Sequence, residues 1–193
     1  YDDVAHRNIA FGPSQQKAYD AVVLNLVDQD IFSRQHHHAT LMDYRPRYIR
    51  GDEVAVLVSR ISPEHRDSVL NQIFEVRGKS KNFLLDFLSM ELDLYPTHTS
   101  DNLEYFRDVI NAYGPLAFGE GASIEDVLES LLIERVYSPP KGSLSVVNNI
   151  KRRRKIGEAA LHILVNQRSE RAMNILKEAA SEKFFNGQLR SIA

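Results

Sequence analysis

The chain has 193 residues, of which 43% are hydrophobic and 26% charged, as in ordinary globular domains and unlike disordered chains. It has no cysteine, which excludes disulfides, thiolate zinc sites and cysteine nucleophiles. The net charge of −2 conceals an uneven distribution, because residues 81–139 carry 3 basic and 11 acidic side chains and residues 141–193 carry 11 basic and 4 acidic ones.

The first third of the chain predicts a short arm followed by helices. Residues 1–13 lack hydrophobic periodicity and predict an N-terminal arm. Ser14 is a suitable N-cap for a helix to about Asp30, where apolar residues recur every three or four positions. A further short helix is expected over 39–44.

Residues 51–61 fit two kinds of structure. Val54, Val56 and Val58 alternate as in a strand. An isolated strand would leave its backbone hydrogen-bonding groups unsatisfied, and no second convincing strand is present. We therefore predict a helix.

Start and stop signals divide the middle of the chain into four helices. Ser62-Pro63 is a cap followed by proline at the first helical position, and Ser123 with Asp126 resembles a capping box. The four predicted helices start at Pro63, Ser80, Ser100 and Ser123, and they stop at Gly78, Pro96, Gly114-Pro115 and Pro139-Pro140.

Two helices are predicted in the remainder, one from Ser143 or Ser145 to Gln167 and one over 169–185. The fold class is therefore all-α, a single-domain irregular helical bundle of about seven to eight helices. Within it we expect a helical core over 14–138 and a C-terminal helical pair over 139–193. The apolar runs are far shorter than the ~20 residues of a membrane span.

Five consecutive cations, Lys151 to Lys155, interrupt the apolar stripe of the predicted helix for one turn. Such a turn is solvated, paired with the acidic residues of 81–139, or held against an anionic partner. Clustered Lys and Arg also bind nucleic-acid phosphates. A nuclear-import signal has the same composition. The candidate partner- or phosphate-binding residues are Lys151, Arg152, Arg153, Arg154 and Lys155, with Arg45, Arg47 and Arg50 as weaker candidates.

Histidine-containing segments are the candidates for a catalytic or metal site in the sequence. In His36-His37-His38 neighbouring side chains point in different directions, so no metal site is predicted. His65-Arg66-Asp67 matches the tripeptide of a kinase catalytic loop, but no other kinase motif accompanies it. A helical enzyme using His36 to His38, Asp43 or His65 remains an alternative, with no cofactor predicted.

The composition and the basic run favour a non-enzymatic helical binding or adaptor module of a larger intracellular protein, either cytoplasmic or nuclear if eukaryotic. Its expected partner is an acidic protein surface contacted through residues 151–155. The alternative is the backbone of DNA or RNA at the same residues. We expect no membrane contact, and a homo-oligomer is a further possibility. The sequence begins without methionine, which suggests a piece of a longer or processed protein.

Overall fold

The structure is a computed structural model that describes residues 11–29, 49–95, 100–137 and 150–181, together with the backbone of 36–37 and 46–47. The described residues form eight α-helices, one π-helical segment and a two-residue antiparallel pair of strands, which confirms the all-α class. The elements are α1 Pro13–Asp28, β1 His36–His37, β2 Pro46–Arg47, α2 Gly51–Val58, α3 Pro63–Arg77, α4 Lys81–Leu94, α5 Ser100–Phe118, α6 Ile124–Leu131, η2 Leu132–Tyr137, α7 Ile150–Gln167 and α8 Glu170–Ala180.

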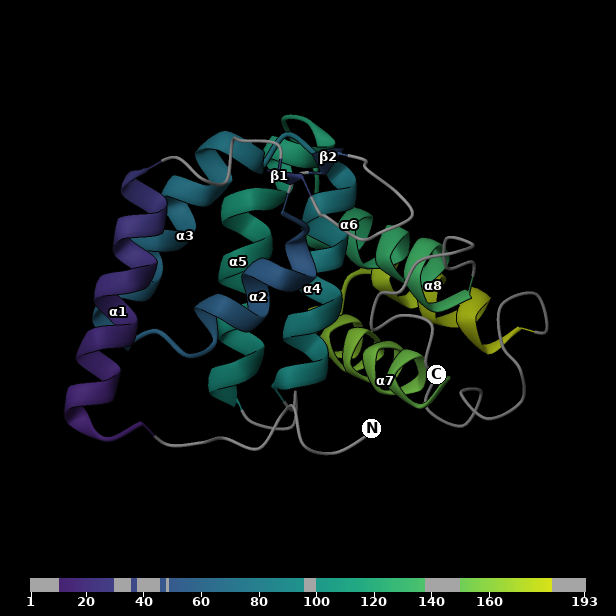
Figure 1. Cartoon of the computed structure of the whole chain (residues 1–193). Coiled ribbons are helices and arrows are strands. Elements are labelled where there is room, and N and C mark those ends of the chain that lie inside the picture. The colour runs from purple at the N-terminus through teal and green to yellow at the C-terminus, as the bar shows by residue number, and fades with distance from the viewer. Residues whose placement is uncertain are drawn as a thin grey trace.

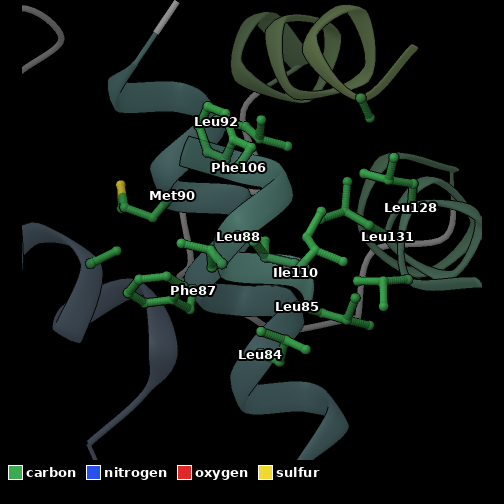
Figure 2. Packing of buried hydrophobic residues seen from close by; sticks show 14 of the residues in the cluster. Leu84, Leu85, Phe87, Leu88, Met90, Leu92, Phe106, Ile110, Leu128 and Leu131 are labelled. Atoms are coloured by element: carbon green, nitrogen blue, oxygen red, sulfur yellow. The ribbon is translucent and has the colours of Figure 1, made fainter. Parts of the chain in front are cut away.

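Helix α4 lies at the centre of the bundle and contacts α2, α5, α6, α7 and η2 (Figure 1). It is buried on nearly every side, as expected for a helix whose apolar residues are distributed around its whole circumference. In Figure 2, Phe87 and Met90 lie on one side of α4, and Leu85 lies on the other side, toward Leu128 and Leu131 of α6. Helix α1 stands at one side of the molecule, far from α7 (Figure 1).

The backbones of α2 and α4 approach very closely. A Cβ atom on Gly51 would lie 2.0 Å from the carbonyl oxygen of Phe83 and 2.5 Å from the backbone nitrogen of Phe87. Only glycine allows two helices to meet at that distance. The helix predicted over 51–61 is therefore confirmed as α2, and its first residue is a packing contact.

Two predicted helix starts need correction in their details. Helix α1 begins at Pro13, and its N-cap is Gly12, so Ser14 is not the cap. The amide of Gly12 instead donates to the side chain of Gln15, at 3.0 Å. Ser62 is the N-cap of α3 as predicted, but its hydroxyl makes no capping bond and donates to the carboxylate of Asp20 in α1.

The predicted stop at Gly114-Pro115 is wrong, because α5 continues through the proline to Phe118. Proline removes one helical hydrogen bond, but the turn after it is retained by packing, since Ala117 and Phe118 lie against the core. The helix ends at Gly119, which has φ +101° and whose amide donates to the carbonyl of Pro115 at 3.0 Å. That positive φ favours glycine and terminates the helix.

The predicted helix from Ser123 starts correctly but changes its winding. The capping box forms, since Asp126 accepts from the amide of Ser123 at 2.8 Å. From Leu132 the chain is π-helical, and Arg135 in this segment is buried at 3% exposure. Its guanidinium donates to Asp86 of α4 at 2.8 Å. Cap and periodicity signals do not report this change of winding.

The acidic middle and the basic end of the chain meet in the fold. Ser169, the N-cap of α8, donates to Glu125 at 2.5 Å. Arg171 of α8 pairs with Asp126 and with Glu129, the latter at 3.2 Å. These α6 carboxylates help to join α6 to α8. No helix among the described residues is long and apolar enough to span a membrane.

Candidate functional site

The basic turn, Lys151 to Lys155, occupies the first turns of α7. Its inner side bonds to the C-terminal ends of α4 and η2. Arg152 pairs with the carboxylate of Asp93 at 3.4 Å and Lys155 pairs with it at 3.5 Å. The ammonium group of Lys155 also donates to the backbone carbonyl of Asp93. Asp93 belongs to the acidic segment 81–139, so that segment covers part of the basic turn.

Arg153 holds the end of η2. Its Nε donates to the carbonyl oxygen of Val136 at 2.7 Å, and its Nη2 donates to that of Tyr137 at 3.5 Å. The last carbonyls of a helix have no partner within the helix and carry partial negative charge. Arg153 and Lys155 therefore supply cations to the C-terminal ends of η2 and α4.

The outer side of the basic turn faces solvent. Lys151 is exposed, and the side chain of Arg154 is 51% exposed. Lys155 belongs to both sides, since its side chain is 51% exposed while its ammonium group is bonded to Asp93. Arg154 pairs with Glu158, one turn further along α7, at 2.7 Å. An exposed pair of this kind contributes only about 0.3–0.5 kcal/mol, so an incoming anion can replace it at little cost.

The weaker arginine candidates do not join the basic turn. Arg45 lies outside the described residues, and only the backbone of Arg47 is described, in β2. Arg50 precedes α2 and pairs with Asp52 at 2.8 Å. Since α2 packs beside Phe83 and Phe87, Arg50 is separated from the Asp93 end of α4 by roughly 10 Å of helix rise.

The histidine alternative gains no support from the described residues. His36 and His37 form β1, with only their backbone described, and His38 and Asp43 lie outside the described residues. His65 is half-buried in the first turn of α3. Within the described part of the chain, no three metal-binding side chains gather in one place.

The sequence reasoning missed a buried ionic cluster at the C-terminal end of α4. Arg66 of α3 pairs with Glu91 at 3.0 Å, and the hydroxyl of Tyr105 donates to the same carboxylate oxygen at 2.8 Å. The guanidinium of Arg66 lies over two rings, 5.1 Å from the centroid of Tyr95 and 4.5 Å from that of Tyr105. These four residues form the Glu91 cluster.

Burial raises the pKa of Glu91 to about 7, against the lowering effect of the Arg66 guanidinium. A carboxyl group with such a pKa suits proton transfer, but the Glu91 side chain is 0% exposed and beyond the reach of a substrate. The cluster is therefore a structural tie between α3, α4 and α5. A single glutamate among Leu88, Met90 and Leu92 was the available signal, since a charge in an apolar run needs a buried partner.

A second missed feature is a groove between η2 and α8, which we call the η2–α8 groove. It encloses about 250 Å³ of empty space, part of which is open to solvent. The groove is lined by Glu129, Leu132, Ile133, Tyr137, Ile175, Glu178 and Ala179. Tyr137 connects it to the basic turn, because the carbonyl of this residue accepts from Arg153.

Comparison with known proteins gives no identification: no protein-family model matches the chain, and neither a curated protein nor a solved structure matches it significantly.

Proposed function

We propose that this chain is a non-enzymatic helical binding module, and that the outer side of the basic turn binds an acidic segment of a partner protein. The observation that carries the proposal is that some cations of the basic turn bond to other helices while others face solvent. Arg152 and Arg153 are directed to the ends of other helices. Lys151 and Arg154 lie on the exposed side of the same helix.

The anchored inner side makes the outer cations an organised surface. Because Arg153 and Lys155 bond to the ends of η2 and α4, the first turn of α7 is held in one position. A partner that meets fixed charges loses less conformational entropy on binding than one that meets a flexible tail. Exposed cations also steer an acidic partner toward the surface and speed its association.

The size of the basic turn favours carboxylates of a protein over a nucleic-acid backbone. Five helical residues span about 7 Å, whereas duplex DNA carries a continuous track of charge with one phosphate per ~1.7 Å of its axis. Arg50 does not extend the surface, since it pairs with Asp52 near the other end of α4. The net charge of −2 also weakens long-range attraction to a polyanion.

The test measures binding of two probes, a short poly-glutamate peptide and a short DNA duplex, by fluorescence anisotropy at low salt. The double variant Lys151→Glu/Arg154→Glu should bind the peptide at least about tenfold more weakly. The matched control, Lys17→Glu/Lys79→Glu, makes the same change in net charge at exposed cations elsewhere and should bind normally.

Unchanged peptide binding by the Lys151/Arg154 variant would overturn the proposal. Tighter binding of the duplex than of the peptide, lost in the same variant, would identify nucleic acid as the partner class and would also overturn it. Circular dichroism serves as the folding control, and both double variants should retain their helices.

A further inference from the structure

We infer that the η2–α8 groove receives one apolar side chain of the same acidic segment, next to the basic turn. The inference rests on the proposed function and specifies its partner as a short segment with an apolar anchor and neighbouring carboxylates. The groove and the basic turn would then bind two parts of one ligand.

The lining of the groove fits a single apolar side chain. Its apolar residues come from both walls: Leu132, Ile133 and Tyr137 of η2, and Ile175 and Ala179 of α8. Ile133 is 40% exposed, which leaves an aliphatic surface in contact with water. The empty space of about 250 Å³ includes open solvent, so the groove is a shallow depression and not an enclosed cofactor cavity.

The groove ends where the basic turn begins. Helix α8 runs in the same direction as α6 and η2, because Ser169 meets Glu125 while Ile175 and Ala179 line the groove beside η2. Tyr137 therefore marks the C-terminal end of one wall, and Arg153 contacts that end. A segment anchored in the groove reaches the cations within a few residues, since an extended chain advances about 3.3 Å per residue.

The charges around the groove indicate where the carboxylates of the partner lie. At the α6 end, Arg171 pairs with two carboxylates, those of Asp126 and Glu129, so its charge is already balanced there. On the α8 wall, Glu178 is exposed and repels an acidic ligand. The attractive charges are those of the basic turn, so the carboxylates of the partner should lie on the η2–α7 side of its apolar anchor.

The test compares two synthetic peptides on the full chain, one with a leucine flanked by glutamates and one with alanine in place of that leucine. The unaltered chain should bind the leucine peptide about tenfold more tightly, which corresponds to burial of part of the side chain. Ile133→Gln should abolish that preference. Glu178→Lys should strengthen binding of both peptides by removing the repulsion.

The matched control is Met173→Gln. Met173 is an exposed apolar residue like Ile133, but it lies in α8 and does not line the groove, so this variant should keep the tenfold preference. Equal affinity for the two peptides in the unaltered chain would overturn the inference. If both peptides still bind and Lys151→Glu/Arg154→Glu abolishes their binding, the proposed function stands without the groove. If that double variant also binds normally, both proposals fail.

Two other occupants would also overturn the inference. Sedimentation that shows dimers of the unaltered chain and monomers of Ile133→Gln would assign the groove to a second copy. A leucine preference that appears only after Phe184→Ser and Phe185→Ser would assign it to the last residues of the chain itself.

Discussion

Glu91 and Asp93 lie two residues apart in α4, and both are buried and pair with arginine, yet the cations around Asp93 are more exposed to solvent than the one beside Glu91. Successive residues of a helix are about 100° apart, so the two carboxylates face nearly opposite sides. Glu91 faces α3 and α5 and is 0% exposed. Asp93 faces α7 and is itself only 7% exposed, but its partners Arg152 and Lys155 are 29% and 51% exposed.

This difference separates charges that are committed to folding from charges that are available for binding. Glu91 has lost its hydration completely, and it depends on Arg66, whose side chain is 20% exposed. The cations around Asp93 keep water on their outer side and can change partners cheaply. Exchangeable charge therefore lies on the α7 side of α4, and four predictions test this difference.

The largest expected effect comes from breaking the buried pair. Arg66→Met removes the cation that lowers the pKa of Glu91, so at pH 8 the buried carboxyl either stays charged without a cation or takes up a proton that the unfolded chain does not hold. Both outcomes should lower the free energy of unfolding, by about 3–5 kcal/mol. Urea denaturation measures the loss. Tyr105→Phe, which removes only the hydroxyl that donates to Glu91, should cost about 1–2 kcal/mol. If the two losses are equal, the pair is not the tie we infer.

The second prediction concerns pH. The folded-state pKa of Glu91 is about 7, above its ordinary value of 4.5, so the folded protein holds this proton more tightly than the unfolded chain does. The stability that Glu91 contributes is present in full below pH 4.5 and is lost as the pH rises through 7. The whole change is at most roughly 3 kcal/mol. Arg66, Tyr95 and Tyr105 are the groups that face this carboxyl.

Glu91→Gln should remove the decline in stability between pH 4.5 and 7, measured by urea denaturation across that range. Asp126→Asn is the control with the opposite sign, and it is measured at pH values below the ordinary pKa of an aspartate. Hydrogen bonds from Ser123 lower the pKa of Asp126, so its contribution is present above its ordinary pKa and lost as the pH falls through the folded value. An unchanged slope in Glu91→Gln would show that Glu91 is already ionised throughout the range.

The helices were predictable where local signals and packing agree. Ser123 with Asp126 starts α6 as expected, since a capping box is a local arrangement. The helix end predicted at Pro115 is wrong because the turn that follows this residue packs on the core, and tertiary contacts outweigh one missing helical hydrogen bond. The π-helical winding of η2 depends on contacts such as Arg135 with Asp86, which lies 49 residues earlier.

The candidate site divides in the same way. Five adjacent cations must leave some charge exposed on any helix, and Arg154 is exposed accordingly. Which cations turn inward depends on where α4 and η2 end in space, so Lys155 on Asp93 could not be foreseen. The η2–α8 groove likewise depends on how α8 lies beside η2.

The third prediction compares two neighbours in the basic turn. Arg153→Gln removes charged hydrogen bonds to the carbonyls at the end of η2, and the expected loss of stability is about 1.5–2 kcal/mol. Arg154→Gln removes only an exposed pair with Glu158, and its loss should stay within about 0.5 kcal/mol. Urea denaturation separates the two, and similar losses would contradict the division into inner and outer sides.

A small effect on stability is expected at Asp93, and it distinguishes the two carboxylates most directly. Asp93→Asn removes ion pairs of 3.4 and 3.5 Å but keeps the backbone carbonyl that accepts from Lys155. The expected loss is about 1 kcal/mol or less, and it should shrink in 1 M salt because partners that reach solvent are screened. The loss in Arg66→Met should not depend on salt in this way.

Since Asp93→Asn also releases Arg152 and Lys155 from a carboxylate, it should strengthen poly-glutamate binding several-fold. A variant that is less stable and binds no more tightly would show that these cations serve the fold alone.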